Sequence, residues 1–179
     1  MLKFSPEAII RELSRNRDTF HSLLANPSET FLHWKPAPEK WCLLEITCHL
    51  YDEEREDFRT RLKSVLLDPN APFPPIDPVG WVSARNYINQ NYGAMLQAFL
   101  QERTSSIKWL ESLSSPQWDN AYEHPTIGPM SGAMILSNWL AHDYLHIRQI
   151  NRYNFQYFQQ QAQEDLSYAG DWQVGGTIK

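Results

Sequence analysis

The chain has 179 residues, which is enough for one domain with a substantial core and too few for two. Its hydrophobic content of 42% and charged content of 21% are ordinary for a soluble globular protein, while 13% aromatic residues predict a core or pocket rich in rings. A net charge of −5 without any block of basic residues argues against nucleic acid as a partner, because phosphate contacts need clustered lysines and arginines.

Membrane-spanning and disulfide-rich proteins are also disfavoured. The N-terminus MLKFSPEAII lacks the apolar run of a signal peptide, and no stretch approaches 18 apolar residues. We therefore expect a cytoplasmic protein that does not enter a membrane. The only cysteines, Cys42 and Cys48, cannot form a disulfide framework and are expected to be reduced.

The first predicted helix begins after Ser5 and ends before Pro27. Ser5, Pro6 and Glu7 supply an N-cap, a proline at the first helical position and an acid in the first turn. An apolar row follows at helical spacing and consists of Ile9, Leu13, Phe20 and Leu24.

The second predicted helix spans residues 43–67. Its packing row consists of Thr47, Tyr51, Phe58, Leu62 and Val65, and a neighbouring row consists of Ile46, His49, Leu50 and Glu53. The segment DPNAPFPPIDPVG, residues 68–80, follows with five prolines. Such a segment cannot be helical, so we expect a stiff, extended crossover.

The third predicted helix opens at Ser83 and stops at residues 114–116, SSP. The fourth is capped by Ser131 and runs to about Phe158. No segment shows sustained apolar and polar alternation, so no strand is predicted.

Four long helices with irregular, proline-bearing connections predict an all-α protein, a four-helix bundle. We assign residues 1–160 to this bundle and residues 161–179 to a C-terminal tail.

The segment LAHDYLHIRQI, residues 140–150, suggests a metal site. His142 and His146 lie four residues apart on the fourth helix, so both imidazoles can point toward one first-row metal ion. A third ligand must come from another helix. His49 is the natural candidate, because it lies inside a predicted helix with apolar neighbours on either side. The alternative is a hydrogen-bonded helical pair or a solvated face.

Two better-known metal motifs do not fit. Residues 142–146 resemble the zincin motif H-E-x-x-H, but Asp143 is shorter than the required glutamate and points about 100° away from His142. We expect Asp143 and Arg148 to face solvent. Di-iron bundles need two Glu-x-x-His motifs, whereas Glu45 precedes His49 by four residues. A mononuclear site is therefore predicted.

Candidate catalytic residues near this site are Glu53 and Gln149. Glu53, one turn after His49, could accept a hydrogen bond, bind the metal or act as a base; an exposed ion pair is the alternative. Gln149 could orient a water molecule, or it could form a hydrogen bond between two helices. Cys48 points away from His49 and is predicted to be a small buried residue.

Two segments resemble the DinB-like family of metal-binding bundles: PAPEKWCLLEITCHLYDEE, residues 36–54, and HPTIGPMSGAMILSNWLAHDYLHIRQI, residues 124–150. That family has a tryptophan before the second helix, an acid one turn in, His-Leu and a further acid, then a glycine turn and H-x-x-x-H followed by glutamine. The matching residues here are Trp41, Glu45, His49, Leu50, Glu54, Gly128, His142, His146 and Gln149. Cys42 departs from the pattern, in which serine or threonine commonly caps the second helix.

The resemblance implies an up-down-down-up bundle whose long crossover is the proline-rich segment 68–80. It also implies that His49, His142 and His146 bind one divalent metal ion, zinc or nickel, with iron or manganese as alternatives. Similar proteins include low-molecular-weight-thiol S-transferases, a thiol-dependent maleylpyruvate isomerase and metal-dependent hydrolases.

Three functions remain open. The metal could activate a low-molecular-weight thiol for S-transfer to an electrophile, which the resemblance favours, or activate water in a hydrolase. The third is a non-enzymatic stress-response bundle with a structural metal. A small-molecule substrate is expected for the two enzymes, and a homodimer is compatible with the bundle.

Overall fold

Four long helices form the body of the protein in the computed structural model, which describes residues 4–170 and 172. The first is α1, Pro6–Leu24; the second is a continuous rod of α3, Leu43–Asp52, the π-helix η1, Glu53–Phe58, and α4, Arg59–Leu67. The third is α6, Tyr92–Ser112, and the fourth is α7, Gly132–Ala162. The all-α four-helix bundle predicted from the sequence is confirmed.

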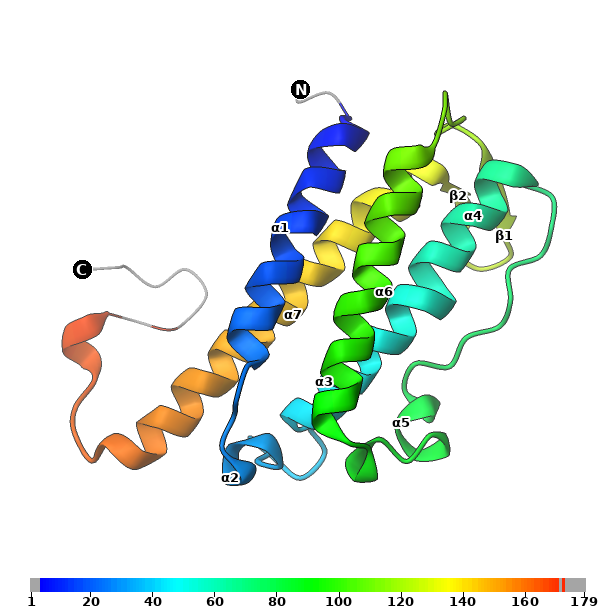
Figure 1. Ribbon diagram of the computed structural model, residues 1–179. Helices are drawn as coiled ribbons and strands as arrows, with labels where there is room; N and C mark the ends of the chain where they lie inside the picture. Colours follow the sequence, from blue (N-terminus) through cyan, green and yellow to red (C-terminus); the bar gives the residue numbers. More distant parts are fainter. Residues whose placement is uncertain (1–3, 171, 173–179) are drawn as a thin grey trace.

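The helices are arranged up-down-down-up, as Figure 1 shows. α1 and α7 run in one direction, and the α3–η1–α4 rod and α6 run in the other. α1 packs against α6 and α7, and the rod packs against the same two helices. Because the rod and α6 are parallel, the chain returns along the bundle between them through the proline-rich segment 68–80.

Local signals explain where the helices begin. Ser5 Oγ accepts a hydrogen bond from the Ala8 amide at the start of α1, and Ser131 Oγ accepts one from the Met134 amide at the start of α7. At the start of α3, the Cys42 amide donates to Glu45 at 2.8 Å, so the glutamate supplies a cap contact.

The third long helix begins later than predicted. Ser83 lies near the end of a short helix, α5, Gly80–Ala84. The 3₁₀ turn η2, Tyr87–Asn89, follows it. Asn86 adopts a left-handed conformation with φ of 49°, which separates these two turns. Asn91 then caps α6 by accepting a hydrogen bond from the Ala94 amide.

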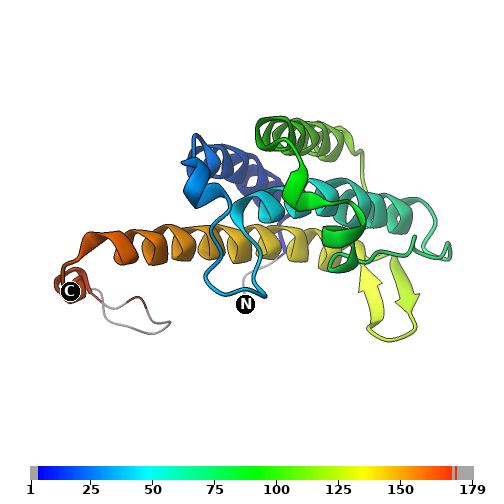
Figure 2. The ribbon, with the colours of Figure 1, turned by 90° about the horizontal axis from the view of Figure 1, so that it is seen from below.

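Short elements account for the other differences from the sequence prediction. The loop before α3 contains α2, Glu29–Leu32, and an antiparallel hairpin of β1, Ala121–His124, and β2, Gly128–Ser131, precedes α7. Four-residue strands are too short for alternation to be recognised. α7 continues to Ala162 rather than Phe158, and its end extends beyond the other helices (Figure 2).

Part of the C-terminal tail is described. It contains the 3₁₀ turn η3, Ser167–Ala169, and Trp172, whose ring stacks on Phe155 at 4.3 Å. Residues 171 and 173–179 of the predicted tail lie outside the described residues.

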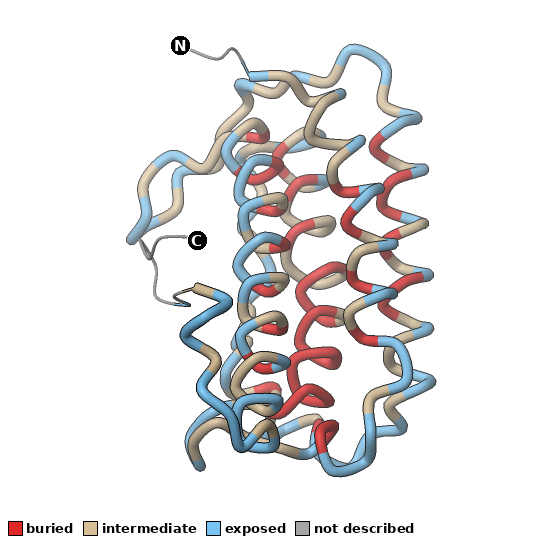
Figure 3. Tube along the Cα trace, turned by 90° about the vertical axis from the view of Figure 1, so that its left-hand side faces the viewer, coloured by how far each residue is buried: buried red, intermediate tan, exposed pale blue. Residues whose placement is uncertain are grey.

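Buried residues recur along the inner faces of the four long helices (Figure 3). One apolar cluster centres on Phe20 and Phe99, whose rings meet edge to face at 5.4 Å; a second includes Phe58 and Trp139, stacked at 5.7 Å. Among the described helices, none is both long and apolar enough to span a bilayer.

Candidate metal centre

The three histidines predicted as ligands meet between two helices. His49 comes from α3, and His142 and His146 come from adjacent turns of α7. The Nε2 atom of His142 lies 3.3 Å from Nε2 of His49 and 3.1 Å from Nε2 of His146. One ring nitrogen of each residue lies within 4.8 Å of the other two. The structure therefore brings all three candidates together.

These separations suit a tetrahedral metal ion. With metal–nitrogen bonds of about 2.05 Å, two ligand nitrogens of a tetrahedron are about 3.3 Å apart. The separations of 3.3 and 3.1 Å are close to that value. His142 Nε2 lies close to two other imidazole nitrogens. A single ring nitrogen carries either one proton or one lone pair, so it can form a good hydrogen bond with only one of them. The donor set fits a divalent cation better than a hydrogen-bonded trio.

Burial keeps the imidazoles neutral, as metal binding requires. Loss of solvation and the nearby His146 lower the pKa of His49 to about 3. Burial also lowers the pKa of His142, with further contributions from the other two histidines and the Arg103 charge, and burial lowers the pKa of His146. The lone pairs are therefore available across the physiological pH range.

Gln149 contacts a candidate ligand directly. Its Oε1 lies 2.8 Å from Nδ1 of His146, and its Nε2 lies 3.4 Å from the Tyr153 hydroxyl. If His146 donates its Nδ1 proton to this oxygen, its Nε2 carries the lone pair that faces the other histidines. Gln149, predicted as a catalytic residue, is thus placed to orient His146.

Aromatic rings cover the histidines on two sides. The Trp41 ring lies 4.8 Å from the His49 ring, and the Phe58 ring lies 5.0 Å from the His142 ring. Trp139 stacks on Phe58 and is 1% exposed, so it supports this cover from within the core. These apolar rings shield part of the His49 and His142 imidazoles from water.

Glu53, the other predicted catalytic residue, is buried one turn after His49 at the start of η1. It is 5% exposed, and within the described part of the chain it forms no ion pair and its Oε1 has no hydrogen-bond partner. The exposed ion pair considered from the sequence is therefore wrong. Burial, together with the charge of Asp57 and a hydrogen bond to it, raises the pKa of Glu53 to about 8.

Asp143 does not face solvent, contrary to the sequence prediction. It is 0% exposed and binds both Nη atoms of Arg103 at 2.7 Å. The helical spacing correctly separated Asp143 from His142, but it could not show that α1 and α6 enclose that side of α7. Arg148 is exposed as predicted.

Arg103 is the important buried residue that sequence reasoning missed. It is 1% exposed and lies on α6 between Phe99 and Ile107, at four-residue spacing from each. A single arginine inside an apolar helical row was the available signal, because such a charge needs buried acidic partners.

The other polar candidates have separate roles. Cys48 is fully buried and outside the histidine group, as predicted, and Glu45 forms an ion pair with Lys35 at 2.7 Å. His33 contacts Glu29, and His124 accepts hydrogen bonds within the hairpin turn.

Comparison with known proteins agrees with this architecture. The family model of the DinB superfamily matches residues 12–150, which include the three histidines and Gln149. The chain belongs to the DinB superfamily. No curated protein matches it.

A solved structure resembles this DinB-superfamily chain over most of its length. YfiT from Bacillus subtilis, described as a probable metal-dependent hydrolase with an unusual four-helix bundle topology, superposes with a TM-score of 0.77. The two share 16% sequence identity over 88% of this chain and 90% of YfiT, so the likeness establishes the fold.

Removing one imidazole should abolish tight metal binding. We expect His49→Ala to weaken zinc or nickel affinity by more than about 100-fold, because loss of a ligand should exceed the 10–100-fold effect of losing an outer contact. Competition with a chromogenic chelator measures this affinity. His124→Ala, in the hairpin, is the control and should bind metal normally. Metal retention by His49→Ala would show that His49 is not a ligand.

The buried neutral state of His49 should also appear in the pH dependence of folding. Its pKa is about 3 in the folded protein against an ordinary 6.5, so between these values the unfolded chain binds the extra proton. The stability of metal-free protein should therefore fall as pH decreases below 6.5, by up to about 1.4 kcal/mol per pH unit from this residue.

Urea unfolding of metal-free wild type and His49→Gln at several pH values between 7 and 5 measures this contribution. Subtracting the two curves removes the effects of other titrating groups, including Glu53. The wild type should lose more stability than the variant as the pH falls. Parallel curves would contradict a buried neutral His49.

Proposed function

We propose that this protein is a hydrolase of small molecules that uses one divalent metal ion bound by His49, His142 and His146. The observation that carries the proposal is the convergence of the Nε2 atoms of these three histidines at the spacing of metal ligands. Imidazole ligands favour zinc, nickel, iron or copper, and we propose zinc or nickel.

Three protein ligands leave a coordination position open, as in catalytic zinc sites. When bound, such a metal acidifies a coordinated water and polarises a substrate carbonyl. The remaining roles belong to side chains that hold the ligands or carry protons.

Glu53 is proposed as the proton carrier. Two neighbouring acids, Asp52 and Glu54, are paired with arginines, whereas Glu53 has an oxygen without a partner among the described residues. A carboxyl group with a pKa of about 8 can donate and accept protons near neutral pH. It can therefore take a proton during nucleophilic attack and return it to the leaving group.

Gln149 and Trp41 support the site without reacting. Gln149 Oε1 holds His146 through its Nδ1 atom, which fixes the ring orientation. The Trp41 ring lies 4.8 Å from the His49 ring and limits the access of bulk water to it.

The fold shared with YfiT supports hydrolysis over the other two functions. Thiol S-transfer stays a prediction, since a metal at the same position would also lower the pKa of a bound thiol. A purely structural metal does not account for Glu53, whose buried Oε1 has no hydrogen-bond partner among the described residues, because a buried polar atom without a partner costs stability.

Replacing the proton carrier should separate catalysis from metal binding. On a panel of small esters, amides and lactones, we expect Glu53→Gln to lower kcat by about 10²–10⁴-fold, since it removes the proton transfer. Its metal content should equal that of the wild type, because Glu53 lies outside the ligand group. The control is Glu111→Gln, an exposed glutamate near the end of α6.

Two outcomes would overturn this proposal. Undiminished hydrolysis by Glu53→Gln would remove Glu53 from the mechanism. Turnover of electrophiles that depends strictly on an added low-molecular-weight thiol, without hydrolysis in its absence, would assign the protein to S-transfer instead.

A further inference from the structure

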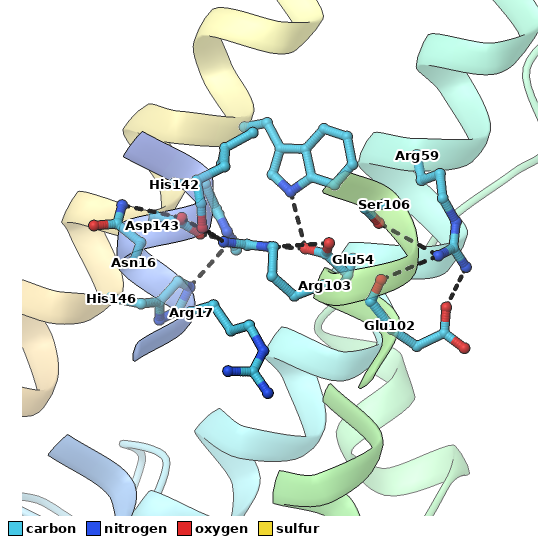
Figure 4. A network of polar contacts seen from close by, with 12 residues as sticks. Asn16, Arg17, Glu54, Arg59, Glu102, Arg103, Ser106, His142, Asp143 and His146 are labelled. Carbon is cyan, nitrogen blue, oxygen red and sulfur yellow. Dashed lines mark hydrogen bonds and ion pairs between the residues drawn. The ribbon is translucent and has the colours of Figure 1, made fainter. Parts of the chain in front are cut away.

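Arg103 forms the most extensively buried ion-pair cluster among the described residues. Its guanidinium donates two hydrogen bonds of 2.9 Å to Glu54 and two of 2.7 Å to Asp143, and a fifth, of 3.3 Å, to the Leu13 carbonyl (Figure 4). All three charged side chains are at most 1% exposed. We name Glu54, Arg103 and Asp143 the Arg103 cluster.

Neighbouring side chains extend the Arg103 cluster to every long helix of the bundle. Asn16 of α1 donates to Asp143 at 3.1 Å, and the Trp139 indole of α7 donates to Glu54 at 2.9 Å. Arg103 itself comes from α6, and Glu54 comes from the π-helix η1 of the α3–η1–α4 rod. The cluster therefore joins four helices at one level.

The same level holds the metal-binding histidines. Asp143 directly follows His142 on α7, and Glu54 follows His49 by five residues on the α3–η1–α4 rod. The two carboxylates thus come from the two segments that must bring the imidazoles together. A shift of one segment along the other would separate His49 from His142 and would also break the bidentate contacts to Arg103.

Stability alone is a weak reason for this arrangement. A buried ion-pair triad replaced by apolar groups of similar volume often leaves a protein as stable or more so, because desolvation offsets the attraction between the charges. A planar guanidinium bound at both edges fixes the distances and angles between the side chains that it joins, which apolar contacts do not. Metal ligands need that accuracy, because their bond lengths tolerate about 0.2 Å.

We propose that Arg103, Glu54 and Asp143 are positioning residues of the metal centre. They set the register of the α3–η1–α4 rod against α7. The inference rests on the proposed metal binding. It assigns a role to residues that lie outside the ligand group and do not contact the substrate.

The test compares two variants of the Arg103 cluster with wild type. The first, E54Q/R103M/D143N, removes all three charges together and so leaves no buried charge unpaired. The second, Arg103→Lys, keeps the positive charge but removes the planar fork. Zinc affinity is measured by chelator competition well below the unfolding temperature, alongside the thermal unfolding of the metal-free proteins.

A matched control is available elsewhere on α6. Arg59 of α4 also contacts α6, where it binds the Glu102 carboxylate and carbonyl and the Ser106 hydroxyl (Figure 4). These contacts do not include α7. Arg59→Met therefore tests the loss of a polar inter-helix contact that does not hold the α7 histidines.

We expect both cluster variants to fold and to bind zinc about 10–100-fold more weakly, while Arg59→Met binds zinc as wild type does. Histidine ¹⁵N spectra of the metal-free variants should show altered ring signals for His142, a change that loss of stability alone would not produce.

Three results would overturn the inference. Wild-type zinc affinity in the folded triple variant is one, and equal weakening by Arg59→Met is another. If the triple variant does not fold, Arg103→Lys decides, and wild-type affinity in that variant is the third. Absence of zinc binding by wild type would instead reject the proposed function.

Discussion

A guanidinium group shut away from water must find a partner for each of its donors, and this constraint organises the interior of the bundle. Arg103 meets it with carboxylates from two helices and a carbonyl from a third. The ion pairs contact both apolar clusters, because the Arg103 guanidinium lies over the Phe99 ring and the Trp139 indole donates to Glu54. An apolar core could have adapted to small shifts between helices. A guanidinium group held by carboxylates on both edges cannot adapt in this way.

The π-helix η1 explains how so many acids can be buried in succession. The Arg59 amide bonds to the Glu54 carbonyl, five residues earlier, so the turn holds an additional residue. Asp52, Glu53 and Glu54 are consecutive and all buried, yet they meet different surroundings. Asp52 binds Arg85 and Glu54 binds Arg103, while burial and the neighbouring Asp57 raise the pKa of Glu53. π-turns are frequent at functional sites, and here the turn begins four residues after the candidate metal ligand His49.

Sequence periodicity predicted the four long helices, and the candidate ligands His49, His142 and His146 were found from their places on two of them. Positions four apart share a helix face, so His142 and His146 could be paired without a structure. The surroundings of that face could not be predicted the same way. Asp143 was assigned to solvent because spacing describes one helix, whereas its burial depends on Arg103, which is 40 residues away in sequence. The hairpin and the delayed start of α6 depend on short turns, and periodicity carries no signal for these.

The account depends on whether the three imidazoles bind a metal ion, and crystallography answers this most directly. Protein purified without chelators should give an anomalous-scattering peak at the zinc or nickel edge, about 2.0–2.2 Å from Nε2 of His49, His142 and His146. A chain that crystallises with no peak there, or with its metal on other residues, would contradict the central claim.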